Sequence, residues 1–141
     1  MIAGKVWGST EVLAEGPFFA LHRLHIKPHS RCSLHMHRNK HNGFHVIAGV
    51  LLIEVHKSDY ELIDVTRLVP GDTASVKPGE YHRFISEESW VTALEWYYPE
   101  PLSEDIVRKD CGASHGGTRH PALDSAGRET VPGVCGPDRD Y

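Results

Sequence analysis

The sequence predicts an all-β domain followed by an irregular tail. Up to about residue 100, short stretches rich in β-branched and aromatic residues recur at intervals of roughly 8 to 12 residues. Glycine and proline separate these stretches, as they do at the turns of antiparallel sheets. The longest uncharged apolar run, residues 46–53, is far shorter than the ~20 residues that a membrane-spanning helix needs. These features are typical of a β-sandwich or β-barrel.

The first expected strands follow in order along the chain. Residues 18–26 alternate loosely between apolar and polar side chains and end at a Lys-Pro pair. Residues 33–37 form a short strand candidate, and the polar stretch 38–43 is expected to be a turn. The stretch 44–55 has too many β-branched residues for a helix, and Gly49 within it predicts a turn or a bulge.

The second half of the domain has the same pattern of strands and turns. Pro-Gly pairs at residues 70–71 and 78–79 predict two tight turns. Strands are expected over 62–68, 73–76, 81–85 and 90–98. After them, residues 103–108 are expected to form one helical turn, capped by Ser103.

The composition limits the organisation and partners of the chain. Its 141 residues are 40% hydrophobic and 24% charged, which predicts one globular domain over 1–111 and a Gly/Pro-rich tail over 112–141. A net charge of -4 argues against a nucleic-acid binder. The N-terminus has no long apolar segment, so a cytoplasmic protein without a membrane segment is expected. In that compartment the three cysteines are expected to be reduced, with a Cys111–Cys135 disulfide as the less favoured alternative.

The 11 histidines are the most unusual feature of the sequence. Residues i and i+2 share one face of a strand, so His35 and His37 are expected to point the same way and to form a two-imidazole clamp for a metal ion. A histidine-rich chain contains an H-x-H by chance, so the pair needs corroboration. His82, just after a Pro-Gly turn, is the candidate third ligand.

Two segments carry a resemblance to a known superfamily. The segment from Lys27 to His37, together with Gly49, resembles the first cupin motif, G-x5-H-x-H-x3,4-E-x6-G, with His29 at its first glycine and Asn42 at its glutamate. Residues 71–82 resemble the second motif, G-x5-P-x-G-x2-H, with the proline displaced by one position. The resemblance implies a cupin jelly-roll β-barrel with a metal ion inside one end.

A narrower resemblance is carried by the two ends of the domain. Val-Trp-Gly-Ser at residues 6–9 and the segment 104–108 resemble the opening and closing segments of the type II mannose-6-phosphate isomerase domain, the cupin half of mannose-1-phosphate guanylyltransferases. The resemblance implies a metal site at matching positions of this chain: His35, His37, Asn42 and His82. His35 is a glutamine in that family.

The chain departs from the family at Asn42, where the family has its anionic ligand. Three imidazoles and an amide favour one divalent transition metal ion, with Zn, Ni or Fe expected before the harder ions Mg²⁺ and Mn²⁺. A one-residue bulge would place His41 at this position instead. The resemblance also places Glu95 at a family glutamate, as a candidate general base, and Lys40 at a family arginine, as a candidate substrate-binding residue. The alternative for Glu95 is a salt bridge to Arg83 or Arg23.

Three functions fit these observations. The first is a metal-dependent enzyme of mannose-6-phosphate isomerase-like type, which would act on a sugar or a sugar-phosphate-like small molecule. The second is an Fe- or Ni-dependent cupin dioxygenase, and the third is a non-catalytic metal- or sugar-binding cupin. Small cupins commonly pair through their sheets, so a homodimer is expected.

Overall fold

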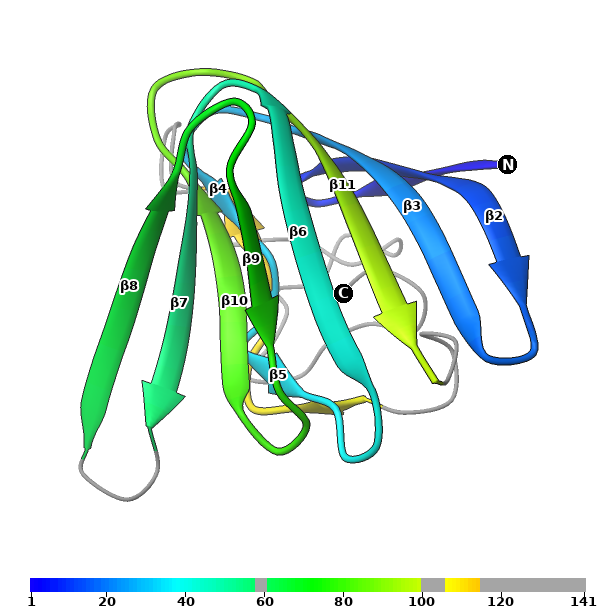
Figure 1. Ribbon diagram of the computed structural model, residues 1–141. Helices are drawn as coiled ribbons and strands as arrows, with labels where there is room; N and C mark the ends of the chain where they lie inside the picture. Colours follow the sequence, from blue (N-terminus) through cyan, green and yellow to red (C-terminus); the bar gives the residue numbers. More distant parts are fainter. Residues whose placement is uncertain (58–60, 100–105, 115–141) are drawn as a thin grey trace, which may run out of the picture.

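The computed structural model describes residues 1–57, 61–99 and 106–114, which form two facing antiparallel sheets (Figure 1). Along the first sheet the strand order is β1 (Ile2–Lys5), β2 (Gly8–Gly16), β3 (Phe19–Ile26), β11 (Val91–Tyr98), β6 (His41–Ala48) and β9 (Thr73–Val76). In the second sheet β10 (Tyr81–Ser86) pairs on one side with β7 (Leu51–Lys57), which pairs with β8 (Leu62–Leu68). On its other side lie β5 (His35–Met36) with β12 (Val107–Arg108), and β4 (Ser30–Arg31) with β13 (Ala113–Ser114). This arrangement confirms the predicted all-β jelly roll.

The core lies between the two sheets, because alternate residues of each strand point inward. Trp7 and Phe84 meet edge to face at its centre, with ring centroids 4.8 Å apart and planes at 89°. Further buried residues include Leu24 and Ile26 of β3 and Phe44 of β6. This apolar core fills one end of the sandwich, so the polar residues buried at the other end are the exception that needs explaining.

Several predicted boundaries are confirmed and two are wrong. The strands β8 and β9 have the predicted bounds. The predicted turn over 38–43 is wrong at its end, because β6 already begins at His41, where it pairs with Tyr98 of β11. The helical turn expected over 103–108 is wrong for Val107 and Arg108, which pair with β5, while residues 103–105 lie outside the described part.

The two glycine positions of the first cupin motif have the backbone conformation that glycine favours. Gly49, in the turn after β6, has φ of 81°, and its Cβ position is blocked by the Trp90 carbonyl oxygen at 2.2 Å. His29 stands at the other glycine position and also adopts positive φ, at 51°. The turn at residue 29 therefore keeps the backbone conformation of the motif even though histidine replaces the glycine.

The expectation for the cysteines is confirmed in one case. Cys32 is free and buried. Cys111 is disulfide-bonded, so the prediction of a reduced thiol is wrong there. Cys135 and the tail from residue 115 lie outside the described residues. In the described ranges no helix is long and apolar enough to span a bilayer.

Candidate metal centre

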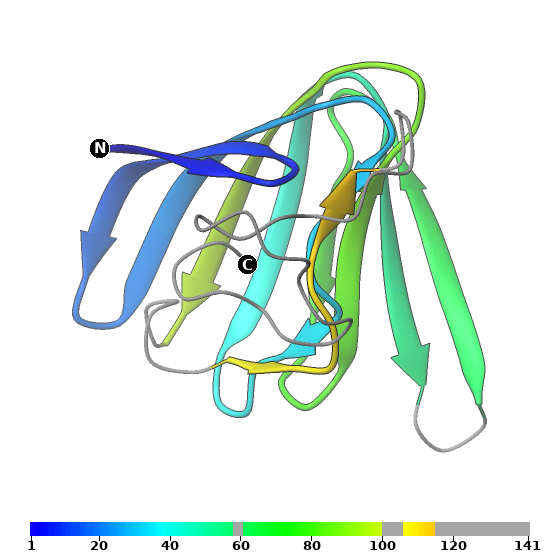
Figure 2. The ribbon, with the colours of Figure 1, turned by 180° about the vertical axis from the view of Figure 1, so that it is seen from behind.

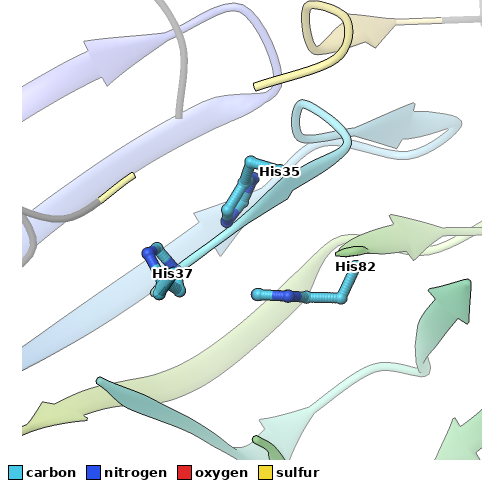
Figure 3. Close-up of side chains that lie close together, drawn as sticks. All are labelled: His35, His37 and His82. Carbon is cyan, nitrogen blue, oxygen red and sulfur yellow. The ribbon is translucent and has the colours of Figure 1, made fainter. Parts of the chain in front are cut away.

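Three histidines from two neighbouring strand segments converge at the polar end of the sandwich (Figure 3). His35 lies in β5 and stands directly opposite His82 of β10, while His37 follows β5 by one residue. One ligand atom from each ring lies within 4.8 Å of the others, and all three side chains are buried. The structure therefore brings the three histidines together, with His35 and His37 two residues apart in one segment and His82 on the strand paired with it.

Main-chain carbonyls fix the tautomers of two of these histidines. The Nδ1–H of His35 donates to the Ser33 carbonyl oxygen at 2.7 Å, and the Nδ1–H of His82 donates to the Glu80 carbonyl oxygen at 2.8 Å. A neutral imidazole has only one N–H, so the Nε2 atom of each ring carries a lone pair. Nε2 is therefore the atom that each of these rings offers as a ligand.

Burial keeps these histidines neutral at ordinary pH. Burial first, and then the charges of His82 and His37, hold the pKa of His35 well below its usual value. Burial also lowers the pKa of His82 to about 4. Metal binding requires the neutral form, so near pH 7 protons do not compete for these two rings.

Asn42 presents an oxygen to the same point. Its Nδ2 lies 3.3 Å from both Glu95 Oε2 and the Trp96 carbonyl oxygen, two acceptors, so its Oδ1 faces His82. Oδ1 lies 3.0 Å from His82 Nε2, which also offers only a lone pair. Two acceptors converge without a proton between them, and a cation bound by both atoms relieves the repulsion. One oxygen and one nitrogen lone pair held 3.0 Å apart would suit a divalent transition metal ion, so this donor set fits one.

Glu95 lies directly behind Asn42, on β11. Its carboxylate is 1% exposed and accepts from the Asn42 amide. The alternative prediction, a salt bridge from Glu95 to Arg83 or Arg23, is not found, because in the described residues both arginines pair with other carboxylates. Arg23 pairs with Glu11, and Arg83 pairs with Glu54 and Asp110. Glu95 is therefore a buried acidic side chain in contact with Asn42 and two residues from Tyr97 in the same strand.

Lys40 is buried, although it is a lysine next to the start of β6. Lysines in loops are usually exposed, but this side chain is fully buried, with Nζ 4.8 Å from the centroid of the Tyr97 ring. The same ring lies 5.5 Å from His37 and 5.8 Å from His22, centroid to centroid. Tyr97 therefore contacts both Lys40 and His37, one of the three histidines.

His22 is a buried residue beside Tyr97 that the sequence interpretation placed on the surface or on a sheet face. It is buried, its Nδ1 lies 3.3 Å from the Thr10 hydroxyl, and its pKa is lowered, chiefly by burial. Its burial could be predicted only from strand alternation, because His22 occupies the same inward-facing side of β3 as Leu24 and Ile26. The rival ligand His41 lies elsewhere, since its ring stacks on Tyr98 at 4.9 Å.

Comparison with known proteins agrees with this geometry. The family model described as mannose-6-phosphate isomerase C-terminal matches residues 3–85, which include the three histidines. No curated protein matches the chain in sequence.

Solved structures share the fold at low sequence identity. The capsular polysaccharide assembling protein CapF of Staphylococcus aureus superposes with a TM-score of 0.69 at 16% identity, over 77% of this chain and 33% of that one. Oxalate decarboxylase of Bacillus subtilis gives 0.67 at 15%, over 77% and 29%. KdgF from Halomonas sp. gives 0.59 at 16%, over 67% and 81%. The chain thus spans about a third of the length of CapF. These similarities support the predicted jelly-roll fold.

Proposed function

The chain belongs to the mannose-6-phosphate isomerase C-terminal family of cupins, and from this premise we propose that it is a metal-dependent enzyme acting on a sugar or sugar-phosphate-like small molecule. The observation that carries the proposal is the convergence of His35, His37 and His82 within 4.8 Å at the buried polar end of the sandwich. Apolar packing does not explain three buried imidazoles at one point, whereas ligation of an ion does.

We assign the ligand positions to these three histidines and to the Asn42 oxygen. All four donors are neutral and nitrogen predominates, which favours Zn, Ni or Fe over Mg²⁺. Bound there, the ion would polarise a substrate carbonyl or hydroxyl oxygen. The four residues themselves orient the site, with His35 and His82 held by main-chain carbonyls and Asn42 held by Glu95.

Glu95 is our candidate for the general base. Its buried carboxylate would take a proton from the substrate at Oε and return it to an adjacent carbon, which is the proton movement of an isomerase. The Asn42 amide, donating to Oε2 from 3.3 Å, would orient the carboxylate for this exchange. Lys40 beside Tyr97 is the candidate for holding an anionic group of the substrate.

Elemental analysis tests the proposal directly. The protein is purified without a histidine tag or added metal, and wild type is compared with His35→Ala and His82→Ala. His45→Ala is the matched control, because His45 bonds Thr73 outside the cluster. We expect near-stoichiometric Zn, Ni or Fe in wild type and in the control, and none in the two site variants. A coloured, redox-active iron or nickel form would favour the dioxygenase alternative. A wild type that neither contains nor takes up metal would leave the barrel as a ligand-binding module and remove the mechanism above.

A further inference from the structure

The segment 106–114 supplies two short strands at the edges of the second sheet, drawn in yellow and orange in Figure 2. Its strand β12 pairs with β5, which places Arg108 opposite His35. Its strand β13 pairs with β4, which places Ala113 opposite Arg31. Asp110 lies between these two strands, where the segment passes from one to the other.

The Asp110 carboxylate connects the two strands that carry the site. Its Oδ1 accepts the Leu34 N–H at 2.5 Å, and its Oδ2 accepts from Arg83 Nη1 at 3.1 Å. Leu34 immediately precedes His35, and Arg83 immediately follows His82. The Asp110 carboxylate therefore bridges the backbone next to His35 and the arginine side chain next to His82.

The neighbouring residue Lys109 reinforces this connection. Its N–H donates to the Leu34 carbonyl oxygen at 2.8 Å, and its Nζ lies 4.0 Å from the centre of the Tyr81 ring, a cation–π distance. Tyr81 immediately precedes His82, so residues 109 and 110 together contact both neighbours of His82 and the residue before His35.

The arginine in this network has a fixed position. Arg83 Nη2 also donates to Glu54 Oε1 at 3.2 Å, and Glu54 is held in turn by His56 at 2.6 Å. The side chains of Arg83 and Glu54 are only 13% and 12% exposed. Water therefore screens the Arg83–Glu54 pair less than a surface ion pair, and this pair holds the guanidinium in place. The Asp110 side chain, which contacts the same guanidinium, is 36% exposed, so its contribution comes from position more than from charge strength.

We propose that Asp110 is a positioning residue that holds His35 and His82 at the separation required to bind one metal ion. The inference rests on the proposed metal site and extends it to a residue that does not touch the ion. Partners outside the ligand shell typically contribute about 10- to 100-fold to metal affinity when they fix ligand orientation. The backbone bond to Leu34 and the ion pair to Arg83 give Asp110 that role for two ligands at once.

Titration with Co²⁺, followed by its visible absorption, tests the proposal in the full chain. Asp110→Asn keeps an oxygen for the Leu34 N–H but removes the charge facing Arg83, and Arg83→Gln removes the same pair from the other side. Glu11→Gln is the matched control, because it breaks the Arg23–Glu11 pair of the first sheet. We expect about a 10-fold or greater loss of Co²⁺ affinity and an altered absorption spectrum in both network variants, and a change below about twofold in the control.

The outcomes separate this inference from the proposed function. If wild type binds Co²⁺ and both network variants bind it equally well with the same spectrum, Asp110 does not position the site. An affinity loss with an unchanged spectrum, matched by an equal loss of stability in the metal-free protein, would assign Asp110 to folding alone. If wild type itself binds no Co²⁺, the proposed metal function fails and the role of Asp110 fails with it.

Discussion

His35 and His82 stand directly opposite each other in the antiparallel pairing of β5 and β10, with ring centroids 4.7 Å apart. Residues paired in this way project from the same face of a sheet. The pairing register therefore determines the distance between the two imidazoles, and His37 completes the group from the residue after β5. A slip of one residue would turn one of the two rings to the opposite face.

Metal binding should stabilise the fold, because the three ligand-bearing positions come together only in the folded chain. At a free Zn²⁺ concentration of 100 times Kd, we expect about 2.7 kcal/mol of added stability in wild type, measured by urea unfolding with and without the ion. His37→Ala should show little of this increase, whereas His45→Ala should keep it. An equal increase in all three proteins would mean that Zn²⁺ binds elsewhere.

Replacing Asn42 with aspartate should change which metal the site prefers. A carboxylate at this position favours harder ions, so affinity for Mn²⁺ should rise relative to Zn²⁺. In Asn42→Asp alone the new carboxylate faces Glu95, and the repulsion of like charges should limit the gain. The double variant Asn42→Asp, Glu95→Gln should show the larger shift in competition titrations. A single variant that equals the double variant would argue against contact between residues 42 and 95.

The metal-free protein should lose stability as the pH falls from about 6.5 to 4. The pKa of His82 is lowered from 6.5 to about 4 in the fold, so the unfolded chain binds the proton first in this range. Titration of His82 takes no stability away above pH 6.5, and the stability lost through it reaches about 3 kcal/mol by pH 4. Urea unfolding with a chelator present should therefore show a shallower pH dependence in His82→Asn than in wild type. Parallel curves would contradict the depressed pKa.

Gly43 should not tolerate a side chain, because Trp96 lies across it on the outer face of the first sheet. A Cβ at residue 43 would stand 2.1 Å from Trp96 Cε2, so the indole would have to move. We expect Gly43→Ala to lower the free energy of unfolding by about 1–3 kcal/mol. Gly4→Ala is the control, since nothing lies within 4 Å of its Cβ position. Similar stability in both variants would show that Trp96 repacks freely.

The strands that could be predicted from the sequence were those flanked by glycine or proline turns. Turns around Gly71 and Gly79 define β9, and both glycines have positive φ. The strands β1 and β2 were not predicted, because their alternation is weak and their stability comes from pairing onto β3. The short strand β12 was mistaken for helix, since its pairing with β5 overrides local helix propensity.

The candidate site also combines features that a local sequence pattern predicts with features that depend on contacts between distant residues. The spacing of His35 and His37 is a local pattern, so their shared face was predictable. The hydrogen bond from the Leu34 N–H to Asp110 joins residues 76 positions apart, and no local sequence pattern predicts it. The burial of Lys40 contradicts the usual behaviour of a loop lysine and depends on tertiary contacts such as the one with Tyr97, 57 residues away. The homodimer and the cytoplasmic location stay predictions.

The carbonyl oxygens of Ser33 and Glu80 give the site a further property. Main-chain groups are present whatever the side chain, so mutation cannot delete the acceptors that set the tautomers of His35 and His82. Substitutions at Asn42, Glu95 or Lys40 can therefore accumulate while both imidazoles continue to present Nε2. The scaffold separates the part of the site that must stay constant from the part that can diversify, which makes it a suitable starting point for designing new metal chemistry.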